Sequence, residues 1–410
     1  MFDPYKIRKD FPMFTNKIKM QGHDLVFLDN ASTTFKPQCV IDAENYYLTH
    51  ETSNSGRGDY DIMYNVDQKI AETRKNVAHF INAQEDEIVF TSGDTESLNL
   101  VASGYFKNHL KKGDEILLTY EEHASNVLPW FNLQRTIGCQ VNFINLTKDG
   151  KITLENVEKA ITKNTKVIAI ANISNVLGFY VDIKPICELA HKYNILVVCD
   201  GAQSVPHVKT DVKDSGVDFL TFSAHKMLGP TGVGVLFGRK ELLDDTEPLL
   251  LGGGMNETFE INGEYVLHPT PAKFEGGTHN IEGIYGFNAA IKYIENIGIE
   301  NIHKYENELR LYAISKLREV KDIVIYNENA DTGIISFNIK GVFAQDLATL
   351  LNSKGIAVRS GNHCAKILKN QINEIATVRA SFYLYNTKEE IDALVEVLKE
   401  GGNFLDAYFA

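Results

Sequence analysis

Residues 219–237 read FLTFSAHKMLGPTGVGVLF, and no other stretch of the chain says as much about its fold. The first four residues form an apolar run that ends in small polar residues, His225 and Lys226. A turn rich in glycine and proline separates this run from a second one, residues 234–237. Short apolar runs bounded by turns are typical of buried strands. The stretch therefore predicts two strands, with a lysine just after the end of the first.

A second strand end of this kind lies upstream. Residues 195–199 form an apolar run that ends in Asp200, Gly201, Ala202 and Gln203. A lysine and an aspartate at the ends of neighbouring strands suit pyridoxal 5'-phosphate (PLP), which needs a lysine to hold its aldehyde and a carboxylate to keep its pyridine nitrogen protonated. Taken singly, Lys226 reads as a surface lysine and Asp200 as a turn residue. The two strand ends together favour the cofactor.

Apolar runs alternate with helical patterns from about residue 20 to residue 265. Near-continuous apolar strands separated by helices indicate a mainly parallel sheet covered on both faces. In such sheets ligands bind at the carboxyl ends of the strands. The sequence therefore predicts an α/β protein with a large domain over residues 20–283. Further strands are expected at residues 88–90, 116–118, 141–144 and 167–171, and helices at 66–82 and 154–162.

The pattern changes towards the C-terminus. Residues 252–280 are rich in Gly, Pro, Thr and Asn, and they predict a long functional loop. A long helical stretch over residues 284–320 follows. We expect residues 284–410, joined by residues 1–19, to form a smaller α+β domain. Its strands are expected near residues 334–339, 356–358 and 378–382, and its last helix over residues 388–400.

Composition excludes several classes of protein. The 410-residue chain carries 41 basic and 54 acidic residues, a net charge of −13, which disfavours nucleic acid as a partner. It has no apolar run of membrane length, and residues 1–11 do not resemble a secretory signal. The five cysteines are odd in number, widely spread and without a CxxC pair. They predict a reducing cytoplasm and neither a disulfide framework nor a metal site.

Residues 88–97 predict a phosphate site. They read as a strand, a small polar turn and a helix start, where backbone N–H groups and the Thr95 hydroxyl suit a phosphate. The alternative is an ordinary helix cap by Asp94 or Thr95. Ser223 and His225 are plausible further donors. Asp94 is an awkward neighbour for a phosphate, and we assign it the capping role or none.

Three further residues suit an amino-acid reaction. His123 follows the strand at residues 116–118, where a flat imidazole can stack on a pyridine ring and help to move protons. With 12 histidines in the chain, a structural role is the alternative. Arg359 and Arg379 lie at strand ends, where a guanidinium can bind a substrate carboxylate with two hydrogen bonds. Solvated strand-end charges are the alternative for both.

Cys364 differs from most of the other cysteines. It lies in the polar loop 359–365, RSGNHCA, with Arg359 and His363 close by. Cationic neighbours favour the nucleophilic thiolate. Small buried hydrophobic roles are expected for Cys139, Cys187 and Cys199.

With these residues in place, the chain resembles the type II cysteine desulfurases, the class V PLP enzymes of the SUF sulfur-mobilisation system. The cysteine loop together with residues 379–387 is the most specific part of the match. The resemblance implies PLP-dependent transferase fold type I and conversion of L-cysteine to L-alanine. It also implies a persulfide on Cys364, passed to an acceptor or scaffold protein for iron–sulfur cluster assembly. The matching segments are residues 28–34, 91–99, 174–178, 200–203, 223–226, 274–278, 359–365 and 379–387.

The resemblance also implies roles for single residues. Lys226, Cys364 and His123 would be catalytic, and Thr278 would reach the phosphate of a neighbouring subunit, which makes the enzyme a homodimer. The cofactor would be held by Thr95, His123, Asp200, Gln203, Ser223, His225, Lys226 and Thr278. The substrate would be bound by Ala31, Asn175, Arg359 and Arg379.

Three positions depart from the family pattern, namely Gly56, Asp94 and Asn362. Selenocysteine lyase and cysteine sulfinate desulfinase remain alternatives within the same chemistry. An aminotransferase has no use for Cys364. A non-catalytic assembly scaffold would be expected to lose Lys226 or Cys364, and both are present.

Overall fold

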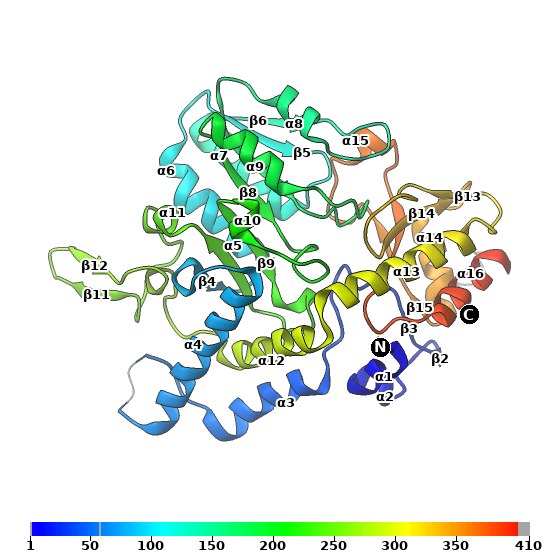
Figure 1. Cartoon of the computed structure of the whole chain (residues 1–410), viewed down its shortest axis with the longest axis horizontal. Helices are drawn as coiled ribbons and strands as arrows, with labels where there is room; N and C mark the ends of the chain where they lie inside the picture. The colour runs from blue at the N-terminus through cyan, green and yellow to red at the C-terminus, as the bar shows by residue number, and fades with distance from the viewer. Residues whose placement is uncertain (1, 57–58, 401–410) are drawn as a thin grey trace.

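A seven-stranded sheet forms the centre of the larger part of the molecule (Figure 1). The computed structural model describes residues 2–56 and 59–400. The strands lie in the order β4-β10-β9-β8-β7-β5-β6, and all neighbours are parallel except β10, which is antiparallel to β4 and β9. The predicted mainly parallel sheet is confirmed. Its strands are β4 (Ile88–Thr91), β5 (Glu115–Thr119), β6 (Gln140–Ile144), β7 (Thr165–Ala171), β8 (Leu196–Asp200), β9 (Phe219–Ser223) and β10 (Gly234–Gly238).

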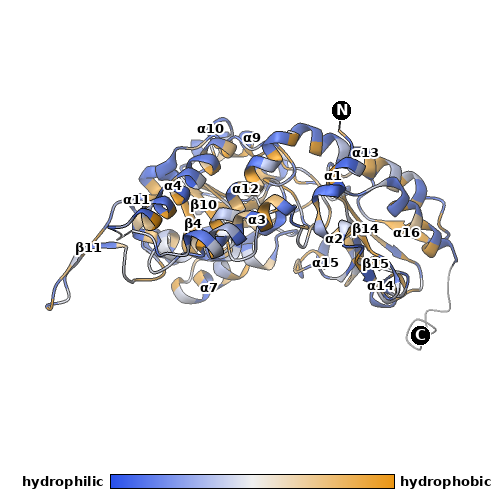
Figure 2. Cartoon of the chain, turned by 90° about the horizontal axis from the view of Figure 1, so that it is seen from below, coloured by the Kyte–Doolittle hydropathy of each residue, from blue (hydrophilic) through white to orange (hydrophobic). Residues whose placement is uncertain are grey.

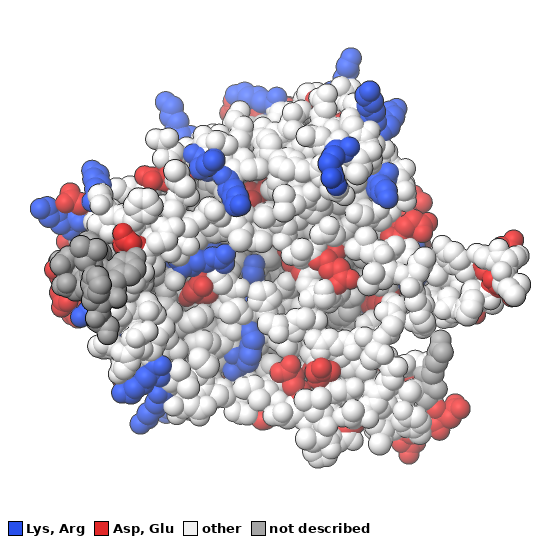
Figure 3. Space-filling model, turned by 180° about the vertical axis from the view of Figure 1, so that it is seen from behind, with Lys and Arg blue, Asp and Glu red and all other residues white. Residues whose placement is uncertain are grey.

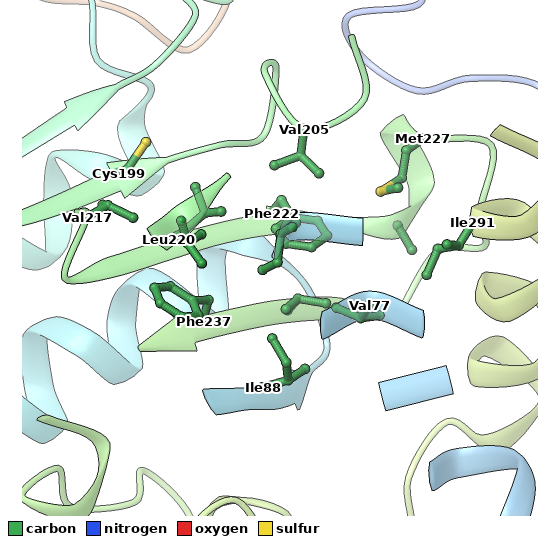
Figure 4. Close-up of a cluster of buried hydrophobic side chains, with 14 of the residues drawn as sticks. Val77, Ile88, Cys199, Val205, Val217, Leu220, Phe222, Met227, Phe237 and Ile291 are labelled. Carbon is green, nitrogen blue, oxygen red and sulfur yellow. The ribbon is translucent and has the colours of Figure 1, made fainter. Parts of the chain in front are cut away.

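Both faces of this sheet are buried. Alternate side chains of β9 belong to two different apolar clusters, with Leu220 and Phe222 in one and Phe219 in the other. Figure 4 shows Leu220, Phe222 and Phe237 beside Val77 and Ile291, which come from helices. Each such fully buried side chain contributes about 1.5–3 kcal/mol. Continuous apolar strands are therefore explained by helices on both sides.

The helices around the larger sheet follow the predicted alternation. The helices expected at residues 66–82 and 154–162 are confirmed as α4 and α8. The helices of this part are α3 (Gln38–Tyr46), α4 (Asp61–Ile81), α5 (Asp94–Leu100), α6 (Lys107–His109), α7 (Leu128–Ile137), α8 (Leu154–Ala160), α9 (Ile183–Lys192), α10 (Val212–Ser215), α11 (Lys240–Asp244) and α12 (Ile281–Ile297).

A second, antiparallel sheet of four strands forms the smaller part, in the order β13-β14-β17-β16. Three of its helices bury apolar side chains against it, as α16 does with Ile391, Leu394 and Leu398. In Figure 2 such helices carry hydrophobic residues on one side and hydrophilic residues on the other. The elements are β13 (Ile323–Ile325), β14 (Ile334–Ile339), β16 (Arg359–Gly361), β17 (Thr377–Ser381), α13 (Ile299–Leu317), α14 (Ala344–Ser353), α15 (Lys369–Ile372) and α16 (Lys388–Glu400).

The N-terminal segment packs on the end of the chain. Arg8 Nη1 donates to Glu390 Oε1 at 2.8 Å and to the carbonyl of Tyr385 at 3.0 Å. Further along, β3 (Val26–Phe27) pairs in parallel with β15 (Ile356–Ala357). The predicted domain boundaries at residues 20 and 283 stay a prediction. The other N-terminal elements are α1 (Pro4–Ile7), α2 (Pro12–Thr15), β1 (Lys19–Met20) and β2 (His23–Asp24).

The prediction of a long loop is wrong for part of residues 252–280. β11 (Asn256–Phe259) and β12 (Tyr265–Leu267) pair as an antiparallel hairpin that extends from the body of the molecule (Figure 1). Most of its side chains are exposed, including Phe259 and Ile261. An exposed hairpin needs no continuous apolar run, so the sequence pattern gave no strand signal.

The long helical stretch predicted over residues 284–320 is observed, but it is divided into two helices. α12 ends at Ile297 and α13 begins at Ile299, with Gly298 between them at φ +88°. Glycine adopts this backbone conformation at no steric cost, whereas other residues do not. The apolar periodicity continues across the break, which hides it from pattern analysis.

Charge is dispersed over the surface. On the face shown in Figure 3, Lys and Arg side chains lie in separate small groups with Asp and Glu between them. Within residues 2–56 and 59–400, no helix combines the length and the apolar character needed to span a bilayer.

Candidate active site

A cavity of about 200 Å³ opens where β8 and β9 end. Asp200 is the last residue of β8, and Lys226 ends the short 3₁₀-helix (Ala224–Lys226) that follows β9. The two strands are parallel neighbours, with Asp200 opposite Thr221. The predicted meeting of these residues is therefore observed. The cavity is lined by eleven predicted residues: Ala31, Thr95, His123, Asn175, Asp200, Gln203, Ser223, His225, Lys226, Arg359 and Arg379.

Lys226 faces this cavity in surroundings that disfavour its charged form. Burial lowers the pKa of its amine, although the carboxylates of Asp200 and Asp94 act in the opposite direction. A neutral amine is the form that bonds to an aldehyde. The surroundings of Lys226 therefore prepare it for the role that PLP requires.

An unpartnered polar atom indicates that the cavity is built for a polar ligand. Gln203 Nε2 donates to the carbonyl of Ala31 at 2.7 Å, but Gln203 Oε1 is buried with no hydrogen-bond partner in the described part of the chain. Buried polar atoms are rarely left without partners in a native protein. A lysine, a carboxylate and a free polar group together fit PLP.

The predicted phosphate donors lie together on one side of the cavity. The backbone N–H of Asp94 donates to Ser223 Oγ at 2.8 Å, and Thr95 Oγ1 lies 2.7 Å from Ser125 Oγ. Burial and the nearby Lys226 lower the pKa of His225 to about 4, so its ring is neutral at pH 7. These residues can offer hydroxyl, imidazole and backbone N–H donors. Ser125 was not foreseen from the sequence.

His123 is held in one tautomer. The backbone N–H of Ser125 donates to His123 Nδ1 at 3.2 Å, so the ring proton lies on Nε2. Burial, followed by the cationic neighbours Lys226, Arg359 and Arg379, lowers the pKa of His123, although Asp200 raises it. A neutral ring of fixed orientation can stack on a cofactor and donate a proton from Nε2.

Two buried glutamates behind His123 were missed in the sequence. Glu122 accepts hydrogen bonds from Thr119 Oγ1 at 2.7 Å, the backbone N–H of Ala171 at 3.0 Å and Asn126 Nδ2 at 2.7 Å. Burial raises the pKa of Glu122 to about 7 and that of Glu121 to about 8. Their position directly after a buried strand was the available signal. They tie the loop of His123 to neighbouring strands.

Arg379 is a buried arginine and not a solvated strand-end charge. Its side chain is 1% exposed, and its Nη2 donates to Asp29 Oδ1 at 3.0 Å and to Ser32 Oγ at 2.9 Å. Nη1 donates to the carbonyl of Asn175 at 2.8 Å, while Nε has no partner. A fixed guanidinium with a free N–H at a cavity wall suits a carboxylate.

The Cys364 loop has a fixed backbone. The carbonyl of Cys364 accepts from the N–H of Ala124 at 2.8 Å, and its own N–H donates to Asn362 Oδ1 at 3.0 Å. Its φ is +62°, a region that residues other than glycine rarely adopt. Arg359 Nη2, from the cavity wall, donates to Cys364 Sγ at 3.4 Å. The sulfur is partly exposed and connected to the cavity through this arginine.

The expectation that His363 acts as a positive neighbour of Cys364 is wrong. His363 is 2% exposed, and its Nε2 lies 2.9 Å from Thr377 Oγ1. Burial and the adjacent Arg379 and Arg359 lower the pKa of His363 to about 3. It is therefore neutral at pH 7, and among these two predicted neighbours only Arg359 supplies positive charge.

Thr278 is absent from this cavity. It lines a separate hollow with Thr91, Leu250 and Phe274. Its predicted contact with a neighbouring subunit stays a prediction. As expected, Cys139, Cys187 and Cys199 are buried in apolar clusters.

Residues 26–394 match the model of the family described as aminotransferase class V. The chain belongs to the class V aminotransferase family. A probable cysteine desulfurase of Halalkalibacterium halodurans, a relative in sequence, is 42% identical over 408 residues, which cover 99% of each chain.

Solved structures agree with this assignment to the class V aminotransferase family. The cysteine desulfurase CsdA from Escherichia coli superposes with a TM-score of 0.91 at 32% identity, covering 99% of each chain. A cysteine desulfurase from Thermococcus onnurineus gives 0.92 at 37% identity, covering 98% of each chain. The predicted fold class, PLP-dependent transferase fold type I, is confirmed.

Proposed function

We propose that this chain is a PLP-dependent cysteine desulfurase, which converts L-cysteine to L-alanine and keeps the sulfur as a persulfide on Cys364. One observation carries the proposal. Lys226 and Asp200 share a cavity with Arg379, and Arg359 connects the wall of that cavity to the sulfur of Cys364. The similarity to proteins named cysteine desulfurase agrees with this reading.

The chain's own residues divide the remaining work. PLP, when bound, supplies an electron sink for a carbanion next to the amino nitrogen. Lys226 would hold its aldehyde, Asp200 would keep its ring nitrogen protonated, and Gln203 Oε1 and the donors near Ser223 are free to bind its polar groups. Among the predicted substrate residues, Arg379 is the group for the carboxylate, since its Nε is free. Ala31, Asn175 and Arg359 complete the wall around the substrate.

Proton transfer falls to two neutral groups, a base and a donor. The amine of Lys226 and the imidazole of His123 line the same cavity, and the surroundings of each favour its neutral form. The amine of Lys226 can take the Cα proton of a bound amino acid and return it later. Because Nδ1 of His123 accepts from the backbone of Ser125, its Nε2 carries the ring proton and can donate it.

In the sulfur step, the sulfur atom of the substrate is transferred to the sulfur of Cys364. The thiolate of Cys364 attacks the substrate sulfur, a new S–S bond forms and the substrate Cβ–S bond breaks. The electron pair of that bond remains with Cβ, which takes up a proton and becomes the methyl group of alanine. The net reaction joins L-cysteine and a Cys364 thiol and yields L-alanine and a Cys364 persulfide.

The test is alanine and persulfide formation from L-cysteine by purified enzyme. Cys364→Ser should keep bound PLP but lose persulfide formation, because a hydroxyl is a far weaker nucleophile towards sulfur. Cys39→Ser is the matched control, since Cys39 is an exposed free cysteine outside the cavity. Unchanged alanine production by Cys364→Ser would contradict the proposal. Selenocysteine and cysteine sulfinate, assayed in parallel, decide between the desulfurase and its two close alternatives.

We also propose a homodimer with shared sites. Thr278 lies outside the cavity of its own chain, and the neighbouring hairpin exposes Phe259 and Ile261, apolar side chains that a partner subunit would cover. Sedimentation should give a dimer. Mixing inactive Lys226→Ala chains with weakened Thr278→Ala chains should restore some activity, because one hybrid site is then intact. Mixed samples no more active than their components would contradict shared sites.

The persulfide is proposed to pass to an acceptor or scaffold protein of the SUF system for iron–sulfur cluster assembly, in the cytoplasm. The backbone bonds of Cys364 to Ala124 and Asn362 limit its reach, so a partner must approach the sulfur. Alanine formation from L-cysteine should therefore rise when the acceptor is added. An acceptor that takes up sulfur without raising turnover would contradict this.

A further inference from the structure

Asp94 brings a second carboxyl group into the cofactor cavity. Its side chain lines the cavity together with Asp200 and Lys226, and the residue is 8% exposed. Asp94 Oδ1 is buried and has no hydrogen-bond partner among the described residues. We expected Asp94 to cap the helix or to have no role; the cap is wrong, because Gly93 is the N-cap residue of α5 and no side chain caps this helix.

Burial, more than the charges that face Asp94, favours its neutral form. The elements on which α5 packs, namely the strands β4, β9 and β10 and the helical turns at residues 101–106 and 124–126, contain no charged residue. The charges that act on Asp94 are those of Asp200 and Lys226. The other titratable or charged residues around the cavity are His123, His225, Arg359 and Arg379. Burial and the Asp200 carboxylate raise the pKa of Asp94 to about 7, and Thr221 and Lys226 offset part of the rise.

The cofactor adds further negative charge to this space. A phosphate monoester carries about −1.5 to −2 charges at pH 7. The backbone N–H of Asp94 donates to Ser223 Oγ, one of the predicted phosphate ligands, at 2.8 Å. An ionised Asp94 would be a second carboxylate beside Asp200, and it would repel the phosphate at short range in a poorly hydrated site.

We propose that Asp94 carries a proton in the PLP-loaded enzyme, so that retention of PLP weakens as this proton is lost. The inference rests on PLP being the cofactor of the proposed function. A neutral carboxyl can donate one hydrogen bond and accept others, which would satisfy the unpartnered Asp94 Oδ1. Asp94 would thus be a positioning residue whose protonation state sets the affinity for PLP.

The test compares PLP retention by the wild type and by Asp94→Asn, which has nearly the same shape but no charge. Holoenzyme is dialysed against buffers of known PLP concentration from pH 6 to pH 9, and bound PLP is measured by absorbance after release. The ratio of the wild-type Kd to the Asp94→Asn Kd should be flat near pH 6. Above pH 7 it should rise by up to about tenfold per pH unit, since one proton is linked to binding.

Using a ratio cancels the pH dependence of PLP itself, of Lys226 and of the histidines. Glu96→Gln is the matched control, because Glu96 lies on the same helix but outside the cavity. The ratio of the wild-type Kd to the Glu96→Gln Kd should stay constant over the pH range. Asp94→Thr, which also removes the charge, should behave as Asp94→Asn does. It serves as the second variant where the asparagine variant folds poorly.

In protein that binds PLP, a constant ratio of the two Kd values from pH 6 to pH 9 would overturn the role of Asp94. Absence of PLP from every protein, wild type included, would instead contradict the proposed function.

Discussion

Arg359 and Cys364 are joined by a hydrogen bond, in which Arg359 Nη2 donates to Cys364 Sγ over 3.4 Å. The same guanidinium donates from Nη1 to Ser32 Oγ at 3.0 Å in the cavity wall. A positive donor stabilises a thiolate more than a thiol. Arg359 therefore connects the wall of the cavity to the sulfur of Cys364.

Arg359→Gln should slow alkylation of Cys364 by iodoacetamide at pH 7 by about three- to tenfold, the loss expected for one hydrogen bond of about 0.7–1.4 kcal/mol. Mass spectrometry of the Cys364 peptide measures the rate. Lys366→Gln removes an exposed cation from the same loop and is the control. Equal slowing in both variants would show a general charge effect and not this hydrogen bond.

Arg379→Lys should lower kcat/KM for L-cysteine by about 10- to 100-fold, because lysine cannot reproduce the planar set of donors that arginine directs at the cavity. Absorbance should show that PLP is still bound. The control variant is Arg310→Lys. Arg310 is also buried, but it lies in α13, where it donates to Asn307 and to the carbonyl of Glu328. This variant should change stability and leave kcat/KM unchanged. A wild-type kcat/KM in Arg379→Lys would exclude this arginine from carboxylate binding.

Glu121→Gln should stabilise the protein more at pH 8 than at pH 6. Burial, and more weakly the neighbouring Glu122, raises the pKa of Glu121 to about 8 from 4.5, so the folded state holds a proton that the unfolded chain releases. The contribution of Glu121 to the free energy of unfolding is greatest below pH 4.5 and decreases as the pH rises towards 8. Glutamine mimics the protonated acid, so the gain in Tm should grow by a few degrees between pH 6 and pH 8. Exposed Glu158→Gln should show no such trend. A pH-independent difference for Glu121→Gln would mean that the carboxyl is ionised throughout.

Gly298→Ala should destabilise the junction of α12 and α13. Its φ of +88° disfavours any side chain, and a Cβ would lie 2.9 Å from Asn301 Nδ2. The expected loss is about 1–2 kcal/mol, seen as a Tm lower by a few degrees. Gly253→Ala is the control, since a Cβ there meets no atom within 4 Å. An unchanged Tm for Gly298→Ala would mean that the junction relaxes without cost.

The large sheet and the centre of the site were predictable because each depends on local pattern. Apolar runs identified β8 and β9, and polar residues directly after them identified Asp200 and Lys226. Parallel neighbouring strands bring such residues together with few alternatives. Strand-end position and local chemistry also indicated Thr95, His123, Ser223, His225, Arg359, Arg379 and Cys364, whereas the roles of Ala31, Asn175, Gln203 and Thr278 came only from the resemblance to a known family.

The missed features depend on contacts that no local pattern reports. The periodicity that predicted a long helical stretch continues past Gly298 and does not show the break there, and the exposed hairpin has no core-facing run. The neutrality of His363 results from its burial beside Arg379, and the cavity-facing side chain of Asp94 results from the packing of α5 on β9. The protonation state of a side chain depends on its burial and on charges that are distant in sequence. The residues next to His363 and Asp94 in the chain therefore could not predict it.

The contacts of Asn30 determine when the substrate side of the cavity can close in a newly made chain. Asn30 Nδ2 donates to the carbonyl of Ser381 at 2.7 Å and to Asn386 Oδ1 at 2.9 Å, across 351 and 356 residues of sequence. The segment that contains Ala31 therefore leaves the ribosome long before the strand that supports it. At about 5–20 residues per second, the interval is roughly 20–70 s. Closure of this wall is thus an event of the finished chain and not of the growing one.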